Sequence, residues 1–470
     1  MASANSSYDD VRSQIIELEG EKMLKTVPSV EDSSVPRQTT CNAISNPTLY
    51  HNSFFSSEAP MAAARKQYLK IMFGGVVVLT LIIFMIFSIL WGAYFRTPSY
   101  NLTGWIIDFD GSTVGQAVVD GLTQPGIPSK IDWSVLQAEQ FPDGIAGVSH
   151  AVAEHQTWVA VTVNSGASDR LTTSINSPNA TYDGSEAISV FTVEARNENA
   201  FRIIIRPSVE TTLSMISARF GLQVARSLSD SPAVSQLLAT SPQTVTTPIS
   251  YQLVNLRPFS QPLASLVIFT GLIFMIILTF FIAVIGNGAR EATNIHRLLR
   301  YRSLLALRFT TIFTAYFFLS LFYSLLSLAF QLDVNEKFGK SSFLVLWMMD
   351  YTGMLALGLA LESMLTLVGI KFLPMFLLLW IMSNVSVVAF PIEVLPIIYR
   401  YGYAAPCYCI SKIARTIIFG TKNQVGYYFG ILIAWVAISC LTLTLFQFLA
   451  RRRDVRANQQ GPPPTEKVEA

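Results

Sequence analysis

The uncharged stretch IMFGGVVVLTLIIFMIFSILWGAY, residues 71–94, decides the fold class of this chain. A helix rises about 1.5 Å per residue, so about 20 consecutive apolar residues cross the hydrocarbon core of a bilayer. The stretch is therefore long enough to span a membrane. Signal peptides have a shorter apolar part close to the start of the chain, so we expect residues 71–94 to be retained as a signal anchor.

Five further apolar runs predict five more membrane spans. They cover approximately 263–285, 303–330, 343–370, 372–390 and 427–449. Residues 343–390 together exceed one crossing, and Lys371 and Pro374 mark a turn within them. The sequence therefore predicts a mainly α integral membrane protein with six transmembrane helices, five of which form a membrane domain over 263–449.

The composition is typical of a chain partly dissolved in lipid. Charged residues make up 14% of the 470 residues, against roughly 25% in an average soluble domain. A net charge of +2 gives no field that would attract nucleic acid, so we expect no nucleic-acid partner. The four cysteines include no CxxC pair, which argues against a disulfide framework and a structural zinc site.

Basic residues set the expected orientation. Three groups flank the spans: Arg65, Lys66 and Lys70; Arg290, Arg297, Arg300 and Arg302; and Arg451, Arg452, Arg453 and Arg456. All three lie on one side if both termini are cytosolic, as the positive-inside rule requires. The basic residues of 391–426 fall on the other side and disagree. The first 60 residues are rich in Ser, Asp, Glu and Pro, so we expect 1–64 to be a disordered cytosolic tail and 450–470 to be a second tail.

Residues 95–262 are expected to form an exoplasmic α+β domain between spans 1 and 2. Short β-branched runs at 105–107, 158–163, 191–193 and 203–205 predict strands. Residues 114–122 and 209–228 have apolar residues at helical spacing. The domain contains two glycosylation sequons, at Asn179 and Asn101. Asn101 lies close to the first span, so we expect the glycan at Asn179.

Ionisable residues within the spans are candidates for function, because a charge in hydrocarbon is costly and faces protein or water. Asp350 and Glu362 lie in the fourth span, and Arg308 lies in the third at a depth similar to Glu362. One interpretation is a structural ion pair and a hydrogen-bonded carboxyl group. The other is a polar path or head-group site between helices, to which Asn384 and Ser386 of the fifth span would contribute.

The loop 391–426 is apolar, aromatic and interrupted by prolines. Two short half-helices that re-enter the bilayer would fit this pattern, and an interfacial loop is the alternative. Its Glu393 and Arg400 complete the set of polar-seam candidates. Cys407 and Cys409 could form a strained bridge or remain two buried thiols.

We expect no enzymatic activity, cofactor or metal ion. Gly339-Lys340-Ser341 resembles the end of a phosphate-binding loop, but Val334 stands where the first glycine belongs. His150 and His155 are not spaced to bind a metal ion from one face of a helix.

The order of several motifs resembles the fungal nitrosoguanidine-resistance membrane protein family. The resemblance covers roughly 70–450 and rests on Trp91-Gly92-Ala93-Tyr94, Asp108-Phe109-Asp110-Gly111, Val114-Gly115, Phe390-Pro391-Ile392-Glu393, YRYGYAAP at 399–406 and Phe419-Gly420-Thr421. That family has a transport domain similar to the permease half of type-two ABC exporters. The resemblance implies a plasma-membrane protein linked to drug or chemical-stress resistance.

Three functions follow for comparison. The first is a permease-like protein that exports a small molecule or handles lipids, alone, as a homodimer or with a separate energising subunit. The second is a non-transporting scaffold that senses lipid state and regulates signalling. The third, a membrane transferase, lacks a candidate site. Membrane lipids are the expected partners in the first two.

Overall fold

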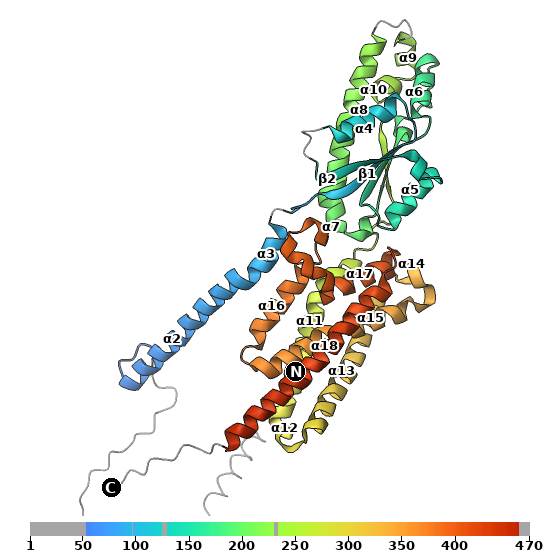
Figure 1. Ribbon diagram of the computed structural model, residues 1–470. Coiled ribbons are helices and arrows are strands. Elements are labelled where there is room, and N and C mark those ends of the chain that lie inside the picture. The colour runs from blue at the N-terminus through green and yellow to red at the C-terminus, as the bar shows by residue number, and fades with distance from the viewer. Residues whose placement is uncertain (1–52, 96, 125–128, 230–233, 460–470) are drawn as a thin grey trace, which may run out of the picture. The chain divides into compact units, whose positions relative to one another are not determined.

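A computed structural model describes residues 53–95, 97–124, 129–229 and 234–459 (Figure 1). The greater part of the predicted cytosolic tails, residues 1–52 and 460–470, lies outside the described residues. Within the described parts of those tails, residues 59–64 are helical rather than disordered because they belong to α2 (Ala59–Ile82), and residues 450–459 belong to α18 (Val425–Gln459).

Five helices among the described residues are long and apolar enough to cross a membrane. The first, Ala59–Tyr94, comprises α2, η1 (Ile83–Phe87) and α3 (Ser88–Tyr94). The others are η6 (Leu266–Thr270) with α11 (Gly271–Ala292), α13 (Tyr301–Ala329), α15 (Ser342–Val368) preceded by α14 (Asn335–Phe338) and η7 (Gly339–Ser341), and α18.

The span predicted over 372–390 differs from the structure. It contains α16 (Leu373–Val385), a helix of 13 residues, whose length of about 20 Å falls short of the hydrocarbon core. Residues 386–390 continue as turns and bends rather than as helix. Residues 386–390 are mostly apolar, so hydropathy predicts that the span continues through them. In the structure the chain turns at these residues before it reaches Pro391.

Helix α16 returns the chain from the end of α15 toward the start of α18 (Figure 1). Ser363 donates to the carbonyl oxygen of Ser439, and farther along both helices Thr366 and Gln447 bind one shared side chain. The two helices therefore run in the same direction. Between them the chain has to return, and α16 with the turns after it forms this return.

A five-stranded mixed sheet forms the centre of residues 102–255, called here the sheet domain. Its strands are β1 (Leu102–Asp108), β2 (Ile131–Leu136), β3 (Val159–Val163), β4 (Ile188–Thr192) and β5 (Tyr251–Asn255), in the order β2-β1-β3-β4-β5. Only the β3–β4 pair is antiparallel. The strands predicted at 105–107, 158–163 and 191–193 correspond to β1, β3 and β4, with residue shifts at their ends.

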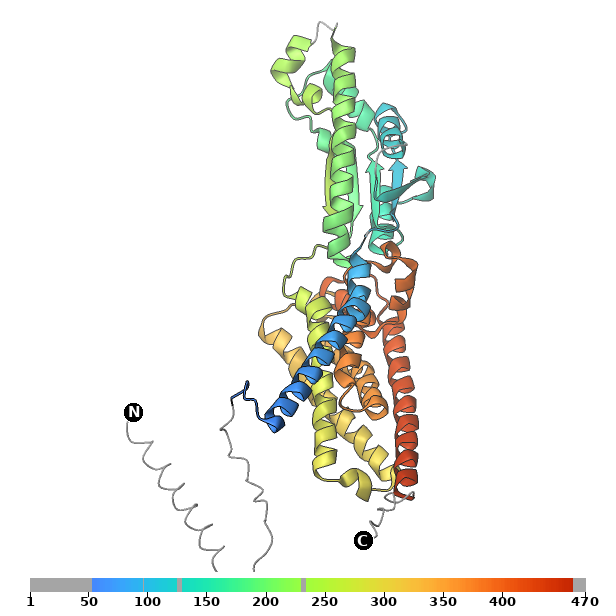
Figure 2. The same cartoon turned by 90° about the vertical axis from the view of Figure 1, so that its left-hand side faces the viewer.

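Helices cover both faces of this sheet. α4 (Thr113–Thr123), α6 (Ala167–Asn176) and α8 (Arg206–Leu228) share one apolar core with the strands, and α5 (Gly144–Ala153) packs on the opposite face. Figure 2 shows α8 running alongside the sheet. The helices predicted over 114–122 and 209–228 are thus confirmed.

The strand predicted at 203–205 is wrong. These residues belong to η5 (Phe201–Ile205), which continues directly into α8. The helical run starts where the Asn197 side chain accepts a hydrogen bond from the Ala200 N–H, at 2.9 Å. This cap fixes a helix in residues whose β-branched side chains favour strands, so local context overrides propensity.

The loop 391–426 is ordered by contacts on both of its sides. It forms η8 (Ile392–Val394), η9 (Ile397–Ala404) and α17 (Pro406–Phe419), and every residue of α17 except Lys412 is buried. Ile392, Val394 and Tyr399 share the core of the sheet domain, whereas Ile410 and Ile417 share the core of the bundle. The remaining short elements are η2 (Ala138–Gln140), η3 (Gly184–Ala187), η4 (Glu194–Arg196), α7 (Glu198–Ala200), α9 (Val234–Thr240), α10 (Gln243–Thr246) and α12 (Ile295–Leu298).

Candidate functional site

Two arginines and one glutamate form a group that we call the charged cluster: the buried Arg308 and Glu362 and the half-buried Arg290. Arg308 Nη2 lies 2.6 Å from Glu362 Oε1, and Arg290 Nη2 lies 2.8 Å from the same oxygen. Arg308 is 3% exposed and Glu362 is 1% exposed. The predicted pairing of Glu362 with Arg308 is confirmed. Arg290 is a second partner that sequence reasoning had assigned to the basic loop between two spans.

Arg308 has two further side-chain acceptors besides Glu362. Its Nη2 donates to Thr366 Oγ1 at 2.7 Å, and its Nη1 donates to the side-chain oxygen of Gln447. Helices α13, α15 and α18 are therefore tied together by one guanidinium group. This full set of partners is what a structural ion pair requires, because a buried charge is tolerated only when it is paired and hydrogen-bonded.

Asp350 lies apart from the charged cluster. Its Oδ2 accepts a hydrogen bond of 2.6 Å from the Ser324 hydroxyl of α13, and its Oδ1 is buried without a partner among the described residues. The residue is 2% exposed. A buried carboxyl group with one free oxygen is unusual in a packed helix bundle, so Asp350 stays a functional candidate.

An apolar segment of α15 separates Asp350 from Glu362. Residues 353–359 are all buried, and the ring of Tyr316 packs directly against Gly358, where a methyl group would overlap its hydroxyl. The Tyr316 hydroxyl donates to the carbonyl oxygen of Thr279 at 3.2 Å. The two carboxyl groups of α15 thus face different surroundings, with close packing between them.

Asn384 and Ser386 hold the junction between α16 and the loop that follows it. Asn384 Oδ1 accepts from the Cys407 N–H at 3.3 Å, and its Nδ2 donates to the carbonyl oxygen of Trp380 at 3.0 Å. The Ser386 and Tyr401 hydroxyls lie 3.1 Å apart. Glu393 and Arg400 are both exposed. The polar-seam candidates therefore occupy separate places, and of the charged ones only Arg308 and Glu362 are brought together.

An apolar groove lies between α11 and α13, at the ends of these helices nearer the sheet domain. It has a volume of about 370 Å³. We call it the lateral groove, and define it by Leu263, Leu266, Val267, Gly271, Phe274, Tyr323, Leu326, Ser327 and Phe330. The Tyr323 hydroxyl donates to the carbonyl oxygen of Gly271 at 2.9 Å, which satisfies the main polar group of the lining. Sequence reasoning missed this groove, because its residues look like ordinary lipid-facing positions.

The sheet domain is joined to α17 by an ion pair. Arg415 Nη1 lies 2.6 Å from Glu198 Oε2 and donates to the carbonyl oxygen of Ala195 at 3.0 Å. Asn199 Nδ2 donates to the carbonyl oxygen of Ala389 at 2.9 Å. Arg415 is 3% exposed, so this is a buried polar connection rather than a surface contact.

Further cations surround this connection. The Lys412 ammonium lies 5.3 Å from the Tyr408 ring centre, and burial lowers the pKa of Lys412 to about 7. The Arg196 guanidinium lies 3.5 Å from the Trp158 ring centre, and burial lowers its pKa to about 10. Burial, together with these cations, lowers the pKa of His155 to about 2. His155 is therefore neutral at physiological pH.

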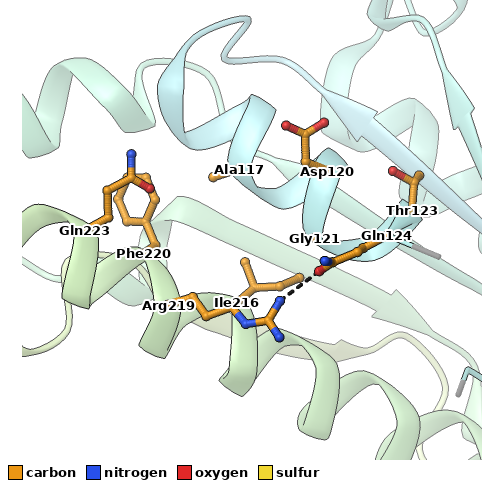
Figure 3. Close-up of a pocket in the computed structure, with 9 residues that line it drawn as sticks. All are labelled: Ala117, Asp120, Gly121, Thr123, Gln124, Ile216, Arg219, Phe220 and Gln223. Carbon is orange, nitrogen blue, oxygen red and sulfur yellow. Dashed lines mark hydrogen bonds between the residues drawn. The ribbon is translucent and has the colours of Figure 1, made fainter. Parts of the chain in front are cut away.

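A pocket of about 530 Å³ lies in the sheet domain between α4 and α8. Figure 3 shows Arg219 of α8 reaching Gln124, the residue that follows α4, to which it donates a hydrogen bond of 2.8 Å. The Asp120 carboxylate points away from Arg219 in this view. The Arg219 guanidinium is thus already hydrogen-bonded to Gln124, and the Asp120 carboxylate does not face it. This arrangement indicates no specific chemistry.

The two sequons differ in geometry. Asn179 is exposed, and its Oδ1 accepts hydrogen bonds from the Thr181 N–H and hydroxyl at 2.9 and 2.8 Å. Asn101 directly precedes β1, and its Nδ2 donates to Asp132 Oδ1 at 2.8 Å. Asn179 has a turn conformation, and its amide donates to no acceptor within the part of the chain that the structure describes, whereas the amide of Asn101 donates to Asp132.

The structure answers one question about the cysteines. Cys407 and Cys409 are free and buried, and burial raises the pKa of the Cys409 thiol to about 12. The strained bridge is therefore not formed. Over the described ranges, no three His, Cys, Asp or Glu side chains lie close enough to hold a metal ion.

Comparisons with known proteins identify a family but not an activity. A family model described as "Protein of unknown function (DUF3533)" matches residues 75–441. An uncharacterized endoplasmic reticulum membrane protein of Saccharomyces cerevisiae is 25% identical over 432 residues, which is 85% of this chain and 84% of the relative. No solved structure matches.

These comparisons support a multi-pass membrane protein. They carry no statement about nitrosoguanidine resistance or about a likeness to ABC exporters, which the motif order had suggested. The relative is described as a protein of the endoplasmic reticulum membrane, whereas the resemblance implied the plasma membrane.

Proposed function

We propose that this chain, which belongs to the DUF3533 family, handles membrane lipids by binding an acyl chain in the lateral groove. The observation that carries the proposal is the groove itself. It combines an apolar lining with a position between two membrane-spanning helices. Its volume of about 370 Å³ falls within the usual range of ligand pockets, about 300–1,000 Å³.

The residues around the groove support a lipid ligand. Leu266, Phe274 and Leu326 are 49%, 55% and 56% exposed, so the groove is open toward the surroundings of the helices. In a bilayer those surroundings are hydrocarbon chains. An acyl chain can enter sideways without crossing water, and the groove offers it no unpaired charge.

A route along the side of the bundle also agrees with the packing of its centre. A central path would have to pass residues 353–359 of α15, which are buried and apolar. A lateral path avoids them. We therefore favour lipid handling over export through the middle of one chain. A permease-like exporter of an apolar small molecule would use the same groove, with a homodimer or a separate energising subunit supplying what one chain lacks.

Drug or chemical-stress resistance would follow from this activity. Changes in the lipid composition of a membrane alter its permeability to apolar compounds, and a lipid-handling protein acts on that composition. Loss of the protein should then sensitise cells and alter their lipids together.

The alternative is a non-transporting scaffold that senses lipid state. One observation favours it: the buried pair Arg415–Glu198 links α17, which packs on the bundle, to the sheet domain. A displacement of the helices would therefore be transmitted to the sheet domain. Lipid binding in the groove is common to both functions, and net lipid movement separates them.

We also propose that the chain passes the membrane six times, with α16 and the turns after it as the fifth pass. The shared direction of α15 and α18 supports this count. Both termini would then be cytosolic and the sheet domain exoplasmic. Labelling of cysteines introduced at 290–302 and 150–200 tests the orientation, and fluorescence microscopy of the tagged chain decides between plasma membrane and endoplasmic reticulum.

The groove is tested by filling it. Ser327→Phe places a ring in the groove, whereas Leu325→Phe adds the same ring type to a lipid-facing position that is not part of the lining. Native mass spectrometry of the full chain, released from membranes in mild detergent, counts the lipids that stay bound. We expect wild type and Leu325→Phe to retain lipid and Ser327→Phe to lose most of it.

A cell assay completes the test. Cells that lack the gene are compared for chemical sensitivity and lipid composition after complementation with each variant. Ser327→Phe should fail to complement while Leu325→Phe succeeds. Equal lipid retention by all three proteins would contradict the proposed groove, and an unchanged lipid composition after gene deletion would contradict lipid handling.

A further inference from the structure

Two members of the charged cluster, Arg290 and Arg308, line a second, separate pocket at the distal end of the bundle, which is the end formed by the last turns of α11 and α15 and the first turns of α13. The pocket has a volume of about 250 Å³ and includes Arg290, Arg308, Thr366 and Gln447 in its lining. A water molecule occupies about 30 Å³ in the liquid. The space is therefore sufficient for a small ionic group with several waters.

The partners inside this pocket do not balance its charges. Arg290 and Arg308 share one carboxylate, and both approach the same oxygen of Glu362. Each guanidinium carries one positive charge at any physiological pH. The cluster thus has two positive charges and one negative charge, with Arg308 and Glu362 buried and Arg290 half-buried.

The two arginines differ in how far they are satisfied. Arg308 donates to Glu362, Thr366 and Gln447. The Arg290 side chain makes one polar contact within the described residues, that of its Nη2 with Glu362, and it is only 14% exposed. Arg290 lines the pocket, and its other side-chain N–H groups have no protein acceptor among the described residues.

The other acid at the pocket does not remove this imbalance. Glu291 is exposed at the rim, and its carboxylate accepts a hydrogen bond of 2.8 Å from Asn287. The imidazole of His296 is directed at the main-chain carbonyl oxygen of Arg290, at 3.1 Å. Neither group supplies a buried negative charge opposite Arg290.

We propose that this pocket binds a phosphate group, with Arg290 as its principal ligand and the Arg308–Glu362 pair as the fixed wall behind it. A planar guanidinium with free N–H groups matches the oxygens of a phosphate in two parallel hydrogen bonds. The phosphate supplies the negative charge that the cluster lacks. The phosphate source is either the head group of an anionic phospholipid from the adjacent leaflet or a free phosphate ion.

The two sources are distinguished with the full chain in detergent and in lipid nanodiscs. Thermal unfolding is measured with sodium phosphate against sodium chloride at equal ionic strength. It is then measured in nanodiscs of phosphatidylcholine with and without phosphatidic acid. A rise in Tm with both probes, or with free phosphate alone, assigns a general phosphate site. A rise with phosphatidic acid alone assigns a lipid head-group site.

The variants separate this pocket from general charge effects. Arg290→Gln removes the proposed ligand, while Arg302→Gln removes the same charge from an exposed position of α13 outside the pocket. Loss of a charge-assisted bidentate contact should weaken phosphate affinity about tenfold or more. Arg302→Gln should leave affinity within about twofold, because an exposed charge is screened by solvent and salt.

Two results would overturn the proposed phosphate site. No stabilisation of the wild-type chain by either probe, or equal stabilisation of wild type and Arg290→Gln, would rule out the site. If Arg290→Gln does not fold, Arg290→Lys keeps the charge but not the fork, and it should bind phosphate measurably but more weakly. Full affinity in that variant would count against a bidentate site. The groove variant Ser327→Phe should leave phosphate binding unchanged, so this inference and the proposed function fail separately.

Discussion

The Arg308 guanidinium of α13 and the Glu362 carboxylate of α15 lie 2.6 Å apart within the bundle. Both side chains are at most 4% exposed, so solvent contributes little to their stabilisation. The pair is the point at which α13, α15 and, through Gln447, α18 are joined. Removing one member would leave a buried charge without its partner, which costs more than the pair contributes.

Glu362→Gln should therefore lower the amount of folded protein. Two arginines lose their shared carboxylate at once, and breaking a truly buried pair costs about 3–5 kcal/mol. The measurement is protein abundance together with Tm of the detergent-solubilised chain. In the double variant Arg308→Met/Glu362→Met, the stranded charge is reduced and part of the abundance should return. Wild-type abundance for Glu362→Gln would show that the pair is not structural.

Asp350→Asn should behave in the opposite way. The amide keeps the shape of the side chain and its contact with Ser324, and no charge has to be buried, so abundance should stay near wild type. Any function that needs the carboxyl group should fall. Chemical-sensitivity and lipid-composition assays measure that function, with Ser324→Ala as a control for the hydrogen bond alone. Full activity of Asp350→Asn would remove this residue from the functional candidates.

Asn179 should be glycosylated, and Asn101 should not. The Asn179 side chain is exposed and already turned toward the Thr181 hydroxyl, whereas Asn101 precedes a strand and bonds Asp132. Gel mobility before and after glycosidase should change for the wild type and for Asn101→Gln. It should stay constant for Asn179→Gln. A glycosidase shift that survives Asn179→Gln but is lost in Asn101→Gln would reverse this assignment.

The sequence predicted most of the helices because lipid leaves few alternatives. A long uncharged run has to satisfy its backbone hydrogen bonds internally, and it does so as a helix. The exception is 372–390, where an apolar composition continues past the end of α16 at Val385. Hydropathy predicts which residues prefer lipid to water, but it does not predict the turn after Val385 through which the chain reaches α17.

In the sheet domain, the missed elements are those with weak patterns. Strands β2 and β5 lie at the two edges of the sheet, and edge strands need no continuous apolar face. The sequence could predict only those ion pairs of the candidate site whose two residues lie at a similar depth in the membrane. The similar depth of Arg308 and Glu362 in their spans predicted that these two residues would pair. It could not suggest Arg290, which comes from a helix end next to the basic loop, nor Arg415 with Glu198, which belong to different parts of the fold.

The Arg415–Glu198 pair should hold α17 to the sheet domain. Arg415→Ala strands Glu198 and removes the bond to the Ala195 carbonyl oxygen, so stability should fall by about 3 kcal/mol. Hydrogen exchange should become faster around residues 195–199 and in α17, while α11 and α13 stay protected. The swapped pair Glu198→Arg/Arg415→Glu restores the charges but not the bond to Ala195, so it should recover part of the protection. Unchanged exchange in Arg415→Ala would mean that the apolar contacts alone hold the two parts together.

Lys412 should make stability depend on pH. Burial lowers its pKa to about 7 from the ordinary value of 10.5, so between these values the unfolded chain binds a proton that the folded chain does not. The free energy of unfolding therefore rises with pH through this window. Below pH 7 both states carry the proton, and the cost of burying the charge is constant. Lys412→Met removes that cost, on the order of 1 kcal/mol once partial exposure is allowed for.

At about pH 6 to 7, near the folded-state pKa of Lys412, the Lys412→Met variant should therefore have a higher Tm than wild type. The difference in Tm should become smaller as the pH rises toward about 10, where wild-type Lys412 is neutral in both states. The measurement is the difference in Tm between the two proteins across this range. The matched control is Lys422→Met, on the same loop outside α17, for which we expect no comparable trend. A difference between Lys412→Met and wild type that stays constant with pH would show that the Lys412 ammonium reaches solvent and is not held in its partly buried position against Tyr408.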